Sequence, residues 1–161
     1  MSDQVLTEQA SQEQIAWVRL LRGYAGLTGD LSASLHREHG LTINDYEVLL
    51  LLSHAEERRM RRIDLARAVK LSASGITRLL DGLQEQGYVE RANCSDDARV
   101  TYAVLTNAGL EKLRAAAGSH TEAIREALSA RYSSEELNTL AELLLRLPGA
   151  GDGDPFACEP G

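Results

Sequence analysis

A helix, a tight turn, a second helix and a two-stranded ribbon are predicted within residues 58–106. They constrain the fold more than any other feature of the chain. The second helix is expected over residues 72–86, because its apolar side chains recur at the 3.6-residue period of one helical face. Ser72 stands where an N-cap belongs, and Gly87 stands where helices often end in a left-handed residue. The apolar stripe consists of Ile76, Leu79, Leu80 and Leu83.

A shorter amphipathic helix is expected over residues 62–70, with only Leu71 before the second helix. Two helices joined by a short turn form the helix-turn-helix unit, whose second helix enters the DNA major groove. Residues 88–92 and 100–104 are rich in β-branched and aromatic side chains, as strands are, and a polar segment joins them. The sequence therefore predicts a mainly α fold with a small β-wing, which is a winged helix-turn-helix.

Long helices are expected on both sides of this unit, over residues 12–39 and 107–147. The first carries a heptad seam typical of packing on another long helix, although three glycines leave a bend open. In the second region Gly118 leaves continuity open, and the capping box of Ser133 and Glu136 starts a last helix. These apolar stripes exceed what one winged helix can cover, so a homodimer is expected to bury them.

The winged helix itself is expected over residues 42–106. Thr42 and Asp45 form a capping-box-like start for a buried helix that runs to about residue 55, and a charged surface turn is expected over 56–59. Residues 1–11 are expected to be a flexible N-terminus. Residues 148–161, rich in Gly, Pro and acid, are expected to be a disordered tail.

The wing carries Asp97-Ala98-Arg99, spaced from Leu105-Thr106 at the start of the next helix. With this motif as its most specific part, the pattern of residues in the unit resembles the multiple-antibiotic-resistance regulator (MarR) family. The resemblance implies a homodimeric regulator that binds double-stranded DNA at a palindromic operator, most simply a repressor released by a ligand. The other matching residues are Leu65-Ala66, Leu71-Ser72, Thr77-Arg78-Leu79, Leu83, Gly87-Tyr88-Val89, Arg91 and Gly109.

The charge balance is compatible with a DNA partner once it is resolved along the chain. The 161 residues are 43% hydrophobic and 25% charged, as in one ordinary soluble domain, with a net charge of −7. Residues 58–99, however, hold nine Lys or Arg against six Asp or Glu. With a screening length of about 8 Å, a phosphate at this unit responds mainly to the local positive balance. The overall acidity predicts weaker non-specific DNA affinity than that of a basic protein.

Other classes of protein find little support in the sequence. No apolar run approaches the roughly 18 residues of a membrane helix, and no export signal is visible, so the cytoplasm is expected. Two cysteines are too few for a disulfide framework and lack zinc-ligand spacing, so neither metal nor cofactor is expected. No nucleophile-and-base arrangement, phosphate loop or His-Glu metal motif suggests an enzyme.

The polar face of the second helix is the predicted DNA-reading surface. Hydroxyl groups can bond phosphates or base edges, an alanine methyl can meet thymine, and arginine can bind guanine or phosphate. The alternative is the solvated face of an ordinary surface helix. The residues predicted to lie at DNA are Ser72, Ala73, Ser74, Thr77 and Arg78.

The resemblance implies a second DNA contact in the wing, where Arg99 enters the minor groove and Asp97 pairs with it and holds its direction. A narrow A·T-rich minor groove attracts arginine through its enhanced negative potential. An ordinary ion pair at a hairpin tip is the alternative. Cys94, near Arg91, is a candidate thiol for redox sensing, with an unreactive loop thiol as the alternative.

The resemblance also implies a pocket for a small aromatic or phenolic anion between the long helices and the DNA-binding unit. Aromatic and histidine side chains are the candidates, although at helical spacing they are more often core or surface residues. A protein-interaction module is a further alternative, and it would lack salt-dependent binding to duplex DNA. The candidate pocket residues are Trp17, Arg22, Tyr24, His36, His39, Tyr46 and His54.

Overall fold

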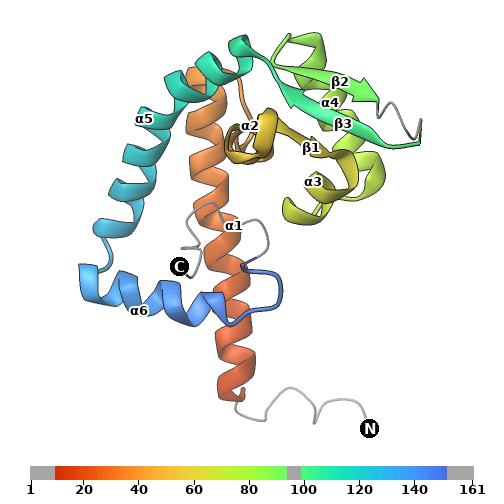
Figure 1. The fold of residues 1–161 in the computed structure, drawn as a ribbon. Coiled ribbons are helices and arrows are strands. Elements are labelled where there is room, and N and C mark those ends of the chain that lie inside the picture. The colour runs from red at the N-terminus through yellow and green to blue at the C-terminus, as the bar shows by residue number, and fades with distance from the viewer. Residues whose placement is uncertain (1–9, 94–98, 152–161) are drawn as a thin grey trace, which may run out of the picture.

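Helices and a small sheet make up the part of the chain that this computed structural model describes, residues 10–93 and 99–151. The predicted architecture, mainly α with a β-wing, is confirmed (Figure 1). The predicted N-terminal segment and tail lie largely outside the described residues. The elements are α1 (Gln12–His39), α2 (Ile43–His54), η1 (Glu56–Arg58), β1 (Arg59–Arg61), α3 (Arg62–Ala68), α4 (Ala73–Glu85), β2 (Val89–Asn93), β3 (Thr101–Leu105), α5 (Asn107–Ser129) and α6 (Ser134–Leu145).

Hydroxyl side chains set where most of the helices begin. The expected capping boxes of Thr42 with Asp45 and of Ser133 with Glu136 both form. Such caps satisfy backbone amides that have no partner inside the helix. The left-handed residue expected after α4 is Gly87, with φ of 76°. The N-caps of α1, α2, α4, α5 and α6 are Ser11, Thr42, Ser72, Thr106 and Ser133.

The sheet has three antiparallel strands in the order β1-β3-β2, one strand more than the sequence predicted. Residues 56–59 are not a simple surface turn, because Arg59–Arg61 pairs with β3 and places Met60 opposite Ala103. Its Arg-Met-Arg sequence lacks the β-branched residues that mark strands, so only the pairing with β3 makes it one. The strands β2 and β3 begin one residue later than expected.

The core surrounds α2, which is the buried helix that its composition predicted. Leu49 and Leu52 are fully buried in it. Around them pack side chains from α3, α4, the sheet and α5, including Leu65, Ile76 and Leu113. This shared core fixes the orientation of α4 relative to the sheet and to α5.

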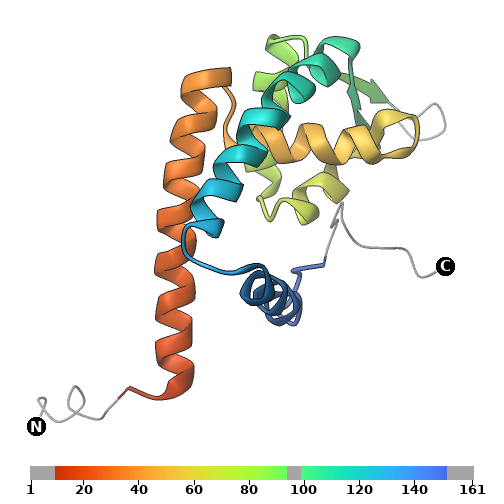
Figure 2. The ribbon, with the colours of Figure 1, turned by 90° about the vertical axis from the view of Figure 1, so that its left-hand side faces the viewer.

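Two long helices extend from this core. The helix α1 is continuous through its three glycines, and α5 is continuous through Gly118. The winged helix lies at one end of α1, while α6 lies level with the other half of α1 (Figures 1 and 2). Figure 2 shows α6 standing away from α1 within this single chain.

Large apolar side chains remain exposed on those outlying helices. Trp17 is 61% exposed and Tyr24 is 67% exposed on α1, and Leu145 is 59% exposed on α6. Exposed apolar side chains gathered on two helices are typical of an interaction surface. The other large exposed apolar residues of this region are Ile15, Val18, Leu20, Leu21, Tyr132, Leu143, Leu144 and Leu147.

Candidate nucleic-acid interface

The helix α4 buries one face and exposes the other, as a recognition helix must. Ile76, Leu80 and Leu83 lie in the core, whereas Ser74 and Arg78 are exposed. The apolar face holds the helix on the core of the winged helix. The polar face is left for a partner.

At the start of α4, Ser72 and Ser74 form one hydroxyl pair. Ser72 Oγ accepts from Gly75 N at 3.1 Å and lies 3.2 Å from Ser74 Oγ. The cap therefore holds Ser72 in place while Ser74 and Ala73 remain exposed beside it. Anionic groups such as phosphates are favoured at helix N-termini, because amides point outward there.

Thr77 occupies a half-buried position further along the same helix. Its hydroxyl donates to Ala73 O at 2.7 Å and accepts from Arg62 Nη1 at 2.9 Å. Arg62, the first residue of α3, was not among the residues predicted to lie at DNA. The only sequence signal for it is its place in the arginine-rich run of residues 58–62.

The wing is an antiparallel hairpin with five aligned pairs, from Val89 opposite Leu105 to Asn93 opposite Thr101. Arg99 is exposed near its tip. Asp97 and Cys94 lie outside the described residues, so the predicted pairing of Asp97 with Arg99 and the predicted thiol sensor stay predictions.

An ion pair links the wing to the recognition helix. Arg91 of β2 pairs with Asp81 of α4, and the two residues line a depression together with Gln84 and Glu85. Neither residue was singled out as a site from the sequence. The pair restricts rotation of the wing relative to α4, although an exposed ion pair of this kind contributes at most about 1 kcal/mol.

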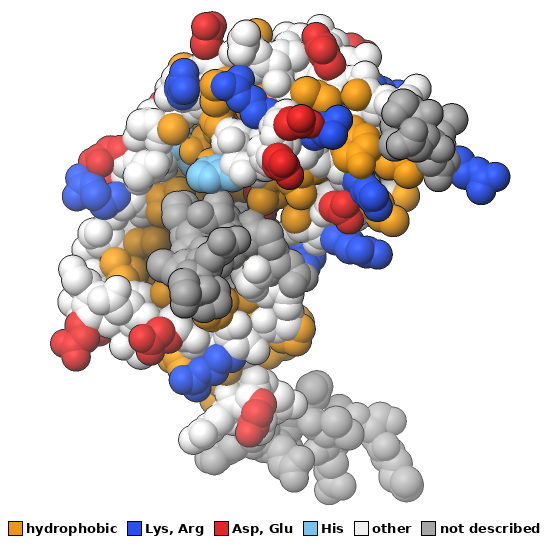
Figure 3. Space-filling view, in the orientation of Figure 1, with side chains coloured by type: hydrophobic (Ala, Val, Ile, Leu, Met, Phe, Trp, Pro, Cys, Tyr) orange, Lys and Arg blue, Asp and Glu red, His pale blue; other side chains and the backbone are white. Residues whose placement is uncertain are grey.

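Cations also line the edge strand β1 and its neighbourhood. Arg58 Nη1 donates to Asn107 Oδ1 at 3.1 Å, and the Arg59 guanidinium lies 5.2 Å from the Tyr102 ring centroid. Arg61 Nε lies 3.5 Å from Tyr102 Oη. Figure 3 shows Lys and Arg side chains distributed over the side of the molecule that carries the winged helix.

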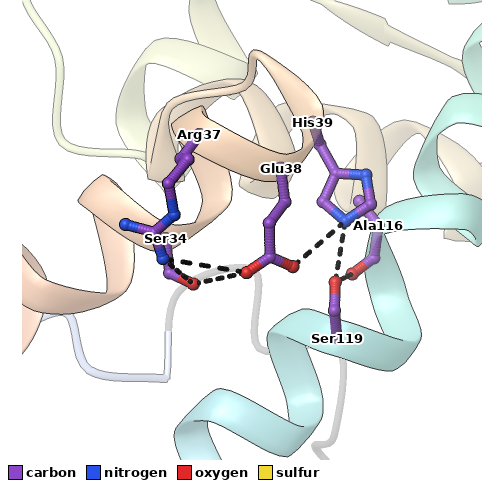
Figure 4. Close-up of polar contacts among 6 residues, drawn as sticks. All are labelled: Ser34, Arg37, Glu38, His39, Ala116 and Ser119. Atoms are coloured by element: carbon purple, nitrogen blue, oxygen red, sulfur yellow. Dashed lines mark hydrogen bonds and ion pairs between the residues drawn. The ribbon is translucent and has the colours of Figure 1, made fainter.

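A polar cluster joins α1 to α5 where the long helices meet the winged helix (Figure 4). His39 Nε2 lies 2.7 Å from Ser119 Oγ and 3.9 Å from Glu38 Oε2. Ser34 Oγ donates to Glu38 Oε1 at 2.9 Å. Ser34, Glu38 and Ser119 border a shallow depression between the two helices, together with His120.

Burial shifts the pKa of three groups on α5 and α2. His120 is in ring contact with Tyr46, with centroids 4.6 Å apart. Burial, with the neighbouring charge of His39, lowers the pKa of His120. Burial raises the pKa of Tyr46 and that of Glu47. These shifts favour the neutral form of each group.

The predicted pocket residues are spread along the chain. Trp17, Arg22 and Tyr24 are exposed on α1, ten or more residues before the polar cluster on the same helix. Tyr46 and His39 lie at the cluster through their contacts with His120 and Ser119. The exposed side chains of His36 and His54 line neither of the two depressions described above, so a ligand pocket stays a prediction.

Residues 10–93 and 99–151 contain no group of three or more His, Cys, Asp or Glu side chains that could hold a metal ion. None of the helices in this part of the chain is both long and apolar enough to cross a membrane.

Comparison with known proteins identifies relatives of the winged helix and of the whole fold. The model of the MarR family matches residues 39–100. The HTH-type transcriptional repressor YetL of Bacillus subtilis is 31% identical over 65% of this chain, which spans 62% of the length of YetL. The chain therefore spans less than two thirds of that curated relative.

Solved structures match over more of their length. Sco3205, a MarR family transcriptional regulator from Streptomyces coelicolor solved in complex with DNA, is 29% identical, with a TM-score of 0.77 over 84% of this chain and 86% of that one. AbsC, a MarR family transcriptional regulator from the same organism, is 34% identical, with a TM-score of 0.75 over 86% of this chain and 93% of that one. With that identity over nearly all of AbsC, and with the family model on its winged helix, the chain belongs to the MarR family.

Proposed function

We propose that this protein is a transcriptional regulator that binds a specific site in double-stranded DNA through α4 and the wing. The observation that carries the proposal is the polar face of α4, where Ser72, Ser74 and Arg78 are exposed while the opposite face is locked into the core. The Arg91 to Asp81 pair supports it, because it joins the wing to the same helix. The DNA complex of Sco3205 supports the same use of this fold.

The proposed role of each surface in DNA binding follows from the chemistry of its exposed groups. The face of α4 reads base edges in the major groove, and Arg99 enters the adjacent minor groove. The cations around β1 contact phosphates, which position the protein without reading sequence. Under this proposal the chain is a binding protein and not an enzyme, and it acts in the cytoplasm on the DNA there.

The proposed assembly is a homodimer formed by α1 and α6. Their exposed apolar side chains, Trp17, Leu21 and Leu145 among them, cost free energy in water and are covered when a second copy packs on them. A two-fold axis then presents two copies of α4 about 34 Å apart, one turn of duplex, which suits a palindromic operator.

The proposed mode of regulation is repression that a small aromatic or phenolic anion relieves. The relative YetL is named a transcriptional repressor, which supports repression over activation. A ligand that binds more tightly to a dimer whose two copies of α4 are wrongly spaced shifts the population away from DNA. The polar cluster of His39 and Ser119, which Tyr46 adjoins through His120, lies where the long helices meet the winged helix, and such a ligand would act there.

A salt titration tests the proposed DNA binding. Genomic fragments enriched by the purified protein supply the site, and the affinity for that duplex is then measured at several salt concentrations. Each phosphate contact contributes roughly −0.9 to the slope of log affinity against log salt, so a dimer that makes about five or more such contacts should give a slope of about −4 or steeper. A protein-interaction module would enrich no duplex and show no such slope. Arg78→Ala should weaken binding to the enriched site without changing the mass of the assembly in solution.

A further inference from the structure

The hydroxyl of Thr77 has one hydrogen-bonding position left for a partner. Its hydrogen is donated to Ala73 O at 2.7 Å, and one lone pair accepts from Arg62 Nη1 at 2.9 Å. A threonine hydroxyl offers one donor and two acceptor positions. In this arrangement a group arriving from outside therefore meets Thr77 only as an acceptor.

Arg62 is placed to hold that arrangement. It is the first residue of α3, and its bond crosses to the second turn of α4. Threonine in a helix divides between two side-chain rotamers, one of which bonds the carbonyl four residues back. The bond from Arg62 favours the rotamer seen here and so opposes release of the hydroxyl hydrogen. A guanidinium has five N–H donors, so this bond occupies only part of its donor set.

We propose that Arg62 is a positioning residue that makes Thr77 select a base presenting an exocyclic amino group. The inference rests on the DNA binding proposed above. In the major groove adenine presents its N6 amino group and cytosine presents its N4 amino group. Thymine and guanine present carbonyl acceptors at the equivalent place, O4 and O6. An acceptor facing the Thr77 oxygen leaves both groups unpaired, which is costly in a desolvated interface.

The inference concerns the orientation of one base pair. Every base pair carries an amino group on one strand and a carbonyl on the other, so Thr77 discriminates A from T and C from G at the base it faces. Reversing that pair exchanges the donor for an acceptor.

Selection from a random duplex library tests the inference. Wild type, Thr77→Val, Arg62→Ala and Arg67→Ala are each carried through the same selection. Thr77→Val is nearly isosteric and removes only the hydroxyl. Arg67→Ala is the matched control, since it removes one exposed guanidinium from the same helix, where Arg67 Nη1 lies 3.9 Å from Asp64 Oδ1. Thermal unfolding checks that each variant is folded.

The expected result is a change at one base pair. Wild type should prefer adenine or cytosine there by about tenfold, within the usual cost of a single mismatch. Thr77→Val should remove the preference at that pair or shift it toward thymine, whose methyl group an alkyl side chain can contact. Arg62→Ala should reduce the preference for adenine or cytosine from about tenfold to about threefold or less, because the Thr77 hydroxyl is released to act as a donor. Arg67→Ala should lower affinity without changing the preference.

Other outcomes overturn the inference in distinguishable ways. A Thr77→Val profile identical to that of wild type would show that Thr77 reads no base. Equal preferences in Arg62→Ala and Arg67→Ala would show that Arg62 acts only as a charge or as a tether between α3 and α4. If wild type itself enriches no sequence, the proposed DNA binding fails, and this inference fails with it.

Discussion

Replacing Gly109 by alanine should destabilise the protein, although alanine is the better helix former. Gly109 lies in the first turn of α5, and its amide donates to Thr106 Oγ1 at 3.0 Å. A Cβ there would overlap the carbonyl oxygen of Tyr88 and lie 2.7 Å from Leu105 Cδ1. The overlapped atom is backbone, so the start of α5 must shift relative to the segment between α4 and β2.

The magnitude follows from two opposing effects. Forcing a methyl group into a packed site costs roughly 1 to 3 kcal/mol, and weakening the Thr106 cap costs about 1 kcal/mol more. The gain in helix propensity returns at most about 1 kcal/mol. The net loss of unfolding free energy is therefore about 2 kcal/mol, which lowers Tm by about 4 to 8 °C for a chain of this length.

Gly118 in the same helix supplies the matched control. A Cβ at Gly118 would meet nothing within 4 Å. Gly118→Ala should therefore raise the unfolding free energy by up to about 1 kcal/mol and Tm by about 2 to 4 °C. Thermal unfolding followed by circular dichroism, at one fixed protein concentration, measures both variants. A Gly109→Ala protein that melts at or above the wild-type temperature would refute the close packing of α5 on Tyr88.

Three further predictions concern assembly, DNA and pH. Leu21→Glu or Leu145→Glu should raise the dimer Kd by more than about a hundredfold, because an unpaired buried charge costs about 3 to 5 kcal/mol. Light scattering should show monomers for these variants, and a dimer for the control Ile63→Glu on α3. Arg99→Ala should weaken operator binding about tenfold or more, or about 1.4 kcal/mol, with the dimer intact in a gel-shift titration. Because the pKa of His120 is lower in the folded state, the unfolded chain binds more protons at His120 than the folded chain does as pH falls below about 6.5. The stability that neutral His120 contributes is present above that pH and is lost below it, so Tm of His120→Phe should depend less on pH than Tm of wild type.

Local chemistry explains why so much of the fold could be predicted. The caps at Thr42, Ser72 and Ser133 act within one helical turn, so their sequence patterns are sufficient to place helix starts. The apolar stripe of α4 likewise depends on spacing alone. The strand Arg59–Arg61 could not be found in this way, because its structure comes from pairing with residues more than forty positions later.

At the site, too, features set by local sequence could be predicted, whereas features set by tertiary packing could not. The exposed face of α4 follows from its periodicity, and Ser74 and Arg78 lie on it as the pattern indicated. The partners that constrain this face, Arg62 on α3 and Arg91 on β2, depend on how the elements cross. A side-chain bond between two elements leaves no periodic signal in either one.

The packing of α5 suggests how dimer geometry reaches the DNA-binding face. At its start α5 is held against the segment after α4, where Thr106 Oγ1 donates to Gly87 O at 2.7 Å. Further along, its Ser119 and His120 contact α1 and α2 through His39 and Tyr46. A continuous helix anchored in this way transmits a displacement along its length. We therefore expect any ligand that moves α1 relative to α5 to change the spacing of the two recognition helices in a dimer.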